Sequence, residues 1–212
     1  TVTIMLEGKF KHKDSKGNEG LLVGGGVQWL TTGKGILHSE MPAQKEGHLW
    51  GFQLWVNLPA AEKMKEPRYQ DLKPSDIPVV ETDKGVQVRV IAGEVAGVKG
   101  AVDGISIKPT MLDVKVPSGE SFEQEIIDGH TLFIYGLEGE SKSGDFVVPP
   151  GEMAIFQPHG NAFKVAAKDA PARFLVVSGA PINEPIARYG PFVMNTHEEI
   201  LQTLRDFKSG NY

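Results

Sequence analysis

The 212-residue chain contains no cysteine. This absence excludes a disulfide framework, a thiolate nucleophile and Cys-ligated zinc or iron–sulfur sites, and it fits a reducing compartment. The chain also lacks clusters of Lys and Arg, and its formal net charge is −5. Direct contact with a nucleic-acid backbone needs such clusters. We therefore expect no direct nucleic-acid partner.

Long apolar runs are absent as well. No run approaches the roughly 18 residues of a membrane-spanning helix, and no signal-peptide-like segment opens the sequence. We therefore expect no membrane partner and a cytoplasmic protein, which would also be nuclear if its source is eukaryotic. Helical periodicity is scarce, whereas 25 Gly and 14 Pro are typical of an all-β fold with many turns.

Two helices are nevertheless predicted. The clearer one lies near the end of the chain, where Thr196 and Glu199 form a capping box and Gly210 offers a stop. We expect this helix to pack its apolar face on the β core. A shorter helix is expected over residues 60–64, because the preceding Pro59 suits a first helical turn.

The sequence also contains an internal repeat. Leu-Glu-Gly ends an apolar strand pattern at residues 6–8 and again at 137–139. A Gly/Pro-rich turn and another apolar strand follow in both places, as "VGGGVQWL" (23–30) and "VPPGEMAIF" (148–156). Two tandem copies of one β unit predict two similar barrels or sandwiches. The charged, Pro-interrupted segment 62–78 is the expected crossing between them.

One stretch, "GKGILHSEMP" (33–42), places His38 and Glu40 two residues apart. Residues i and i+2 of a strand point to the same face, so the imidazole and the carboxylate would share one space. They would serve there as metal ligands or as an acid–base pair; the alternative is a hydrogen-bonded core pair. A metal site of this chemistry needs at least three protein ligands, so the pair is only part of one.

Several long strings resemble the pirin family of the cupin superfamily: "GVQWLTTGKGILHSEMP" (26–42), "LWGFQLWVNLP" (49–59), "EPRYQ" (66–70) and "YGPFVMNTHEEI" (189–200). The resemblance implies an all-β bicupin, with two tandem antiparallel cupin β-barrels and a short C-terminal helix. The domains expected from it are an N-terminal barrel over 1–61, incomplete at its start and holding half of the metal site; a linker over 62–78; a C-terminal barrel without metal over 79–195; and a helix and tail over 196–212.

The resemblance also implies one non-haem iron, or another divalent metal, on three His and one Glu. His38 and Glu40 match the family pattern "HSE" or "HAE". The other two ligands would come from a "HPHRGFE" string directly before the strand that begins here at Thr1. That string is not in this sequence, so the site is expected to be incomplete in this chain. Three readings stay open: residues that precede Thr1, a second chain that completes the site, and a genuine truncation.

The repeat tests the second barrel independently. Cupin barrels place a His-x-His pair 14 and 12 residues before the Gly of the Leu-Glu-Gly turn. Counting back from Gly139 reaches Glu125 and Ile127, and Ile127 cannot bind a metal. Ala154 stands where many cupins have a further His. We therefore expect no metal in the second barrel.

A pocket is expected beside the metal. Gln28, Trp29, Phe52 and Gln53 fall on strands that flank the site, and alternation would send some of them inward. For the aromatic residues the alternative is the barrel core. Gln53 would take its partners from a ligand or a metal-bound water. His12, among the charged residues of "KHKDS", is expected at the surface.

The resemblance implies quercetin 2,3-dioxygenase activity on a flavonol-like small molecule, with Glu40 as the base that deprotonates the flavonol hydroxyl. Whether the chain is an enzyme stays open at this point. The first alternative is a redox-responsive transcriptional or metabolic co-regulator that binds protein partners, which the negative net charge favours over DNA contact. The second is a metal-free truncated bicupin without activity.

Overall fold

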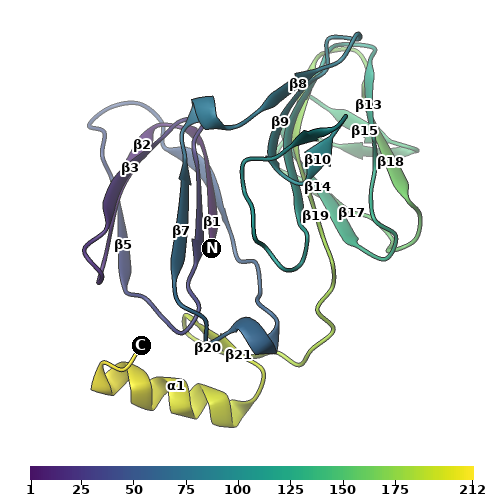
Figure 1. Ribbon diagram of the computed structural model, residues 1–212. Helices are drawn as coiled ribbons and strands as arrows, with labels where there is room; N and C mark the ends of the chain where they lie inside the picture. The colour runs from purple at the N-terminus through teal and green to yellow at the C-terminus, as the bar shows by residue number, and fades with distance from the viewer. The chain divides into compact units, whose positions relative to one another are not determined.

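The computed structural model describes residues 1–212 and consists mostly of short strands, with a single α-helix at the end of the chain (Figure 1). The chain forms two compact units, Thr1–Ser75 with Ile182–Tyr212, and Asp76–Pro181. The first unit therefore contains both ends of the chain. This division differs from the barrel expected over 79–195, because residues 182–195 belong to the first unit.

Residues 1–72 of the first unit form two antiparallel sheets. One has the strand order β6-β1-β4-β7 and the other β3-β2-β5. The strands are β1 (Val2–Glu7), β2 (Lys9–Asp14), β3 (Glu19–Val23), β4 (Val27–Thr31), β5 (His38–Pro42), β6 (Trp50–Leu54) and β7 (Arg68–Leu72).

Strand β7 lies inside the segment expected as a linker. It pairs along its whole length with β4, from Val27 opposite Leu72 to Thr31 opposite Arg68. The charged residues and prolines around it suggested an irregular crossing, but Pro67 precedes the strand and Pro74 follows it, so neither interrupts the ladder. Residues 68–72 thus complete the first unit's larger sheet.

A 3-10 turn, η1 (Ala60–Glu62), follows Pro59 between β6 and β7. The last residues of the chain form a hairpin, β20 (Ala187–Tyr189) and β21 (Phe192–Met194), and the helix α1 (His197–Ser209). The predicted capping box is present: Thr196 Oγ1 accepts from the Glu199 amide, and the Glu199 carboxylate accepts from the Thr196 amide. Gly210 ends the helix with φ 76°. Helix α1 contacts both hairpin strands, and it is too short and too polar to cross a membrane.

The second unit is a larger pair of sheets. Its six-stranded sheet has the order β17-β14-β19-β12-β9-β8, its four-stranded sheet the order β13-β18-β15-β16, and a short ribbon pairs β10 with β11. The elements are η2 (Pro74–Asp76), at its start, and β8 (Val79–Glu81), β9 (Gln87–Ala92), β10 (Glu94–Val95), β11 (Val98–Lys99), β12 (Thr110–Val116), β13 (Ser121–Glu125), β14 (Thr131–Glu138), β15 (Ser141–Ser143), β16 (Phe146–Val148), β17 (Met153–Ile155), β18 (Ala162–Ala167) and β19 (Ala172–Gly179).

One apolar cluster fills the space between the sheets of the second unit. It is built from Val, Leu, Ile and Phe side chains of both sheets, with Phe174 as its largest fully buried member. Burial of such a cluster supplies most of the favourable free energy of folding for a unit of this size. The second unit therefore has a conventional apolar core.

Candidate functional site

A row of polar side chains crosses the larger sheet of the first unit. Thr3 of β1 lies opposite Gln28 of β4 and Gln53 of β6, and Gln28 lies opposite Asp71 of β7. Residues paired across strands share one face of a sheet, so the four side chains form a continuous line. Gln28 is fully buried and donates through Nε2 to Asp71 Oδ1 at 2.9 Å.

A second polar row crosses the smaller sheet. His12 of β2 lies between Gly20 of β3 and Glu40 of β5. His12 is 4% exposed. A Cβ on Gly20 would overlap the Nε2 atom of His12, so glycine at this position provides the room for the imidazole.

Two contacts join the rows. Gln53 Nε2 donates to Glu40 Oε2 at 2.8 Å and lies 3.3 Å from Thr3 Oγ1, while His12 Nε2 lies 3.4 Å from Asp71 Oδ2. The polar cluster therefore consists of Thr3, His12, Gln28, Glu40, Gln53 and Asp71. Its centre is buried, whereas the side chain of Asp71 is 48% exposed and Gln53 is exposed at its edge.

His38 lies beside this cluster. Its Nδ1 is 3.9 Å from Glu40 Oε1, so the two residues predicted to share a strand face do lie together in the structure. Both side chains are about one-quarter exposed. Glu40 Oε1 and His12 Nδ1 are buried and have no hydrogen-bond partner. Buried polar atoms without partners are uncommon in folded proteins and often mark the place of a ligand, an ion or a water.

Two expectations about the site are corrected. His12 is buried rather than exposed, because Lys11 and Lys13 alternate with it and take the solvent-facing side of β2. Gln53 is exposed rather than buried, and its amide nitrogen donates to protein groups, Thr3 and Glu40. The alternation of Phe10 and His12 with the lysines was the feature of the sequence that could have identified His12.

The four predicted pocket residues separate into two pairs. Gln28 and Gln53 belong to the polar cluster, whereas Trp29 and Phe52, one position away on their strands, point to the opposite face. Trp29 is 3% exposed, as expected of a core residue. Asp71 and Tyr69, which sequence reasoning missed, reach the site through β7. The Tyr69 ring stacks on His12 at 5.7 Å.

The surroundings of Tyr69 raise the pKa of its phenol. Burial raises the pKa of the Tyr69 phenol, and the carboxylates of Asp14, Asp71 and Glu40 raise it further. The phenol therefore stays neutral at physiological pH, as an uncharged neighbour of the His12 ring.

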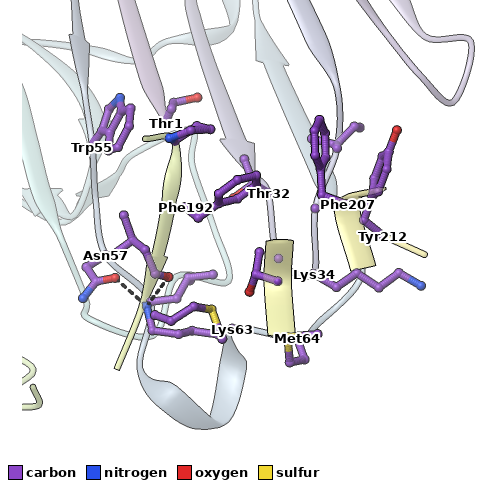
Figure 2. Close-up of a pocket in the computed structure, with 18 of the residues that line it drawn as sticks. Thr1, Thr32, Lys34, Trp55, Asn57, Lys63, Met64, Phe192, Phe207 and Tyr212 are labelled. Atoms are coloured by element: carbon purple, nitrogen blue, oxygen red, sulfur yellow. Dashed lines mark hydrogen bonds between the residues drawn. The ribbon is translucent and has the colours of Figure 1, made fainter. Parts of the chain in front are cut away.

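A cavity of about 740 Å³ opens within the first unit and includes His38 in its wall (Figure 2). Its other walls are the loop 32–37, the segment 55–58, the residues after η1, the β20–β21 hairpin and α1. Cavities of this size commonly hold small molecules.

Comparison with known proteins identifies the fold family. The family model described as Pirin matches residues 1–56, and the one described as Pirin C-terminal cupin domain matches residues 111–212. A Pseudomonas aeruginosa protein provisionally named a quercetin 2,3-dioxygenase is 45% identical over 215 residues, which cover 99% of this chain and 75% of that protein. Human Pirin is 41% identical over 220 residues, covering 99% and 73%.

The chain belongs to the pirin family. A crystal structure of quercetin 2,3-dioxygenase from Acinetobacter baumannii superimposes with a TM-score of 0.91 at 39% identity, over 99% of this chain and 74% of that one. These matches confirm the predicted all-β architecture of two tandem cupin domains with a short C-terminal helix.

The donor set of this pirin-family chain fits part of a metal site. His38 and Glu40 are an imidazole and a carboxylate, the ligands that suit non-haem iron and similar divalent ions. Glu40 Oε1 has no hydrogen-bond partner and lies 3.9 Å from His38 Nδ1, as two ligands of one metal would. No group of three or more His, Cys, Asp or Glu side chains takes up a metal-binding arrangement. The two residues fit as two ligands of a centre that needs more.

Proposed function

We propose that this chain is a metal-dependent flavonol dioxygenase of the quercetin 2,3-dioxygenase type, with His38 and Glu40 as two of its metal ligands. The observation that supports the proposal most directly is the buried Glu40 Oε1, which has no hydrogen-bond partner and lies 3.9 Å from His38 Nδ1. The names of the Pseudomonas aeruginosa relative and of the solved Acinetobacter baumannii structure agree with this chemistry.

The bound metal, iron or another divalent ion, would supply a Lewis acid for the flavonolate and an electron path to O2. The chain's own residues would position the ligand carboxylate, accept the substrate's proton and bind its rings. Gln53 fixes the Glu40 carboxylate through Oε2, which leaves Oε1 directed into the site. Glu40 would accept the proton of the flavonol hydroxyl at Oε1. The apolar walls of the adjoining cavity would hold the flat ring system and exclude water.

The test combines metal analysis with turnover. The full-length protein, loaded with one equivalent of iron, should consume quercetin with loss of its visible absorbance and uptake of O2. We expect His38→Ala and Glu40→Ala to lose both the metal and the activity. Glu19→Gln, at an exposed position of the same unit, should keep both.

Metal content and turnover separate the parts of the proposal. Fully loaded protein that leaves quercetin unchanged would overturn the activity. Retention of a full equivalent of iron by both His38→Ala and Glu40→Ala would overturn the ligand assignment.

A further inference from the structure

The cavity in the first unit has an aromatic wall. Trp55, Phe192, Phe207 and Tyr212 all line it, and Figure 2 shows their rings around the same space. The Phe207 ring lies 5.6 Å from the Phe192 ring and 5.6 Å from the Tyr212 ring. Such walls favour flat, ring-bearing molecules.

The same cavity contains a buried cation. Lys63 is 5% exposed, and its Nζ donates to Asn57 Oδ1 at 2.8 Å and to the Val193 carbonyl at 3.2 Å (Figure 2). Both acceptors are neutral. An ammonium has three N–H donors, so one of them has no acceptor in the protein. Burial lowers the pKa of Lys63, and Glu184 and Glu199 oppose that effect only partly.

The two carboxylates near Lys63 are already engaged elsewhere. Glu184 Oε2 accepts from the Ala60 amide and from Asn195 Nδ2. Glu199 caps α1 by accepting from the amides of Asn195 and Thr196. Neither lies within ion-pair distance of Lys63 Nζ. A buried charge without a partner of opposite sign is costly, and an anion brought into the cavity would remove that cost.

A second cation in the wall is also without a carboxylate partner. The Arg188 guanidinium lies 4.9 Å from the centre of the Trp55 ring, and its one hydrogen bond runs from Nε to the Gly190 carbonyl at 3.5 Å. Its terminal nitrogens are free to donate. Lys34 differs, because Glu66 neutralises it at 2.6 Å. Asp206, the one acidic residue of the wall, accepts from Gln202.

We propose that this cavity binds a small ring-bearing carboxylate. Its ring packs against the aromatic wall, and its carboxylate takes the free N–H of Lys63, with Arg188 as the second source of positive charge. The cavity is the one that the proposed function assigns to the flavonol ring system, so the inference adds a second class of ligand for the same space. Carboxylate binding needs no metal, no oxygen and no turnover, so its failure and the failure of the dioxygenase function can be told apart.

The test compares 1-naphthoate with its neutral analogue 1-naphthamide by titration calorimetry on the full-length protein. We expect naphthoate to bind about tenfold more tightly, the size of one charge-assisted hydrogen bond. The preference should shrink as salt is raised. Lys63→Met keeps the apolar stem and removes the charge, so it should weaken naphthoate binding about tenfold and leave naphthamide binding unchanged.

Two further variants keep the test decisive. Arg188→Gln leaves the Lys63 contacts intact and should weaken naphthoate binding several-fold, even if Lys63→Met folds poorly. Lys34→Met removes a lysine of the same wall that is already neutralised, so it should have little effect. The proposal would be overturned by equal affinity for naphthoate and naphthamide or by the absence of saturable binding. It would also be overturned if Lys34→Met and Arg188→Gln weakened naphthoate binding equally.

Discussion

In the first unit, Thr3 of β1 lies opposite Gln28 and Gln53, and all three carry polar side chains. The internal repeat places Ile134 of β14 at the position of Thr3, 131 residues later. Ile134 pairs with Ala154 of β17 and with Val176 of β19, as Thr3 pairs with Gln28 and with Gln53. Apolar side chains therefore stand in the second unit where the first has this polar row.

The facing sheets show the same contrast. The β2–β5 pairing sets His12 opposite Glu40. In the second unit β15 pairs with β18 through Ser141 opposite Ala167 and Lys142 opposite Ala166, and extending that register by one residue sets Ser143 opposite Val165. His38 then corresponds to Phe163. Phe163 and Val165 belong to the apolar cluster of the second unit. One backbone pairing pattern thus surrounds a polar cluster in one unit and an apolar core in the other, so this pairing pattern does not require the polar residues. Their presence in the first unit favours a ligand-binding role.

The strongest test introduces one polar residue into the apolar core of the second unit. Val165 is 0% exposed, so Val165→Glu would bury a carboxyl group among apolar side chains with no partner. We expect the second unit to lose about 3–5 kcal/mol of stability at pH 7. The loss should shrink at low pH, because burial raises the pKa of such a carboxyl group.

The tryptophans make this measurement selective. All three, Trp29, Trp50 and Trp55, lie in the first unit. Circular dichroism during urea unfolding should show an early transition for Val165→Glu that tryptophan fluorescence does not follow. Lys164→Gln, at the exposed neighbouring position, is the control; it removes only a surface contact with Glu123 and should change little. Unchanged unfolding of Val165→Glu would contradict the contrast between the polar interior of the first unit and the apolar interior of the second.

The second unit does bury one carboxylate, and there it is paired. Asp113 has a fully buried side chain that accepts from Arg89 at 3.0 Å and from Arg173 at 2.9 Å. Burial alone would raise its pKa, but the two arginines outweigh burial and hold the pKa of Asp113 below its usual value. Asp113→Asn should cost about 2–3 kcal/mol, because both guanidinium groups lose a charged acceptor.

The pH dependence follows from the direction of that shift. A carboxylate with a depressed pKa contributes stability that is present above its unfolded pKa of 3.8 and is lost as pH falls through the lower folded value. Denaturation followed by circular dichroism should therefore give a smaller slope of stability against pH below about 4 in Asp113→Asn. Glu138→Gln, at a 57% exposed partner of Arg173, should cost less than 1 kcal/mol. Equal costs in the two variants would contradict the role of burial.

Sequence reasoning recovered what depends on local pattern. The spacing of His38 and Glu40, the capping box at Thr196 and the repeated Leu-Glu-Gly turn each depend on neighbours along the chain. Asp71 was missed because its place beside His12 depends on the pairing of β7 with β4, forty residues away in sequence. Strand register of this kind is set by long-range packing, which a local pattern does not encode.

Gly20 offers a smaller test of the polar cluster. In the second unit the equivalent position, opposite Ser143, is the exposed Phe146, so that register tolerates a large side chain there. In the first unit Gly20→Ala would push its Cβ into the His12 ring. We expect a loss of about 1–2 kcal/mol, measured by tryptophan fluorescence in urea. Leu21→Ala, at an exposed position of β3, is the control and should change the stability little.

The smallest effect is expected at Glu40, where the comparison with Asp113 becomes most direct. Glu40 is one-quarter exposed, accepts one hydrogen bond from Gln53 and has no arginine partner. Glu40→Gln should therefore change the stability of the metal-free protein by less than about 1 kcal/mol, as seen by tryptophan fluorescence. It should at the same time lower the affinity for iron, because a neutral amide is a weaker ligand than a carboxylate. A large loss of stability in Glu40→Gln without any change in iron binding would contradict this assignment. Glu40 would then stabilise the fold, as Asp113 does, and would not be a metal ligand.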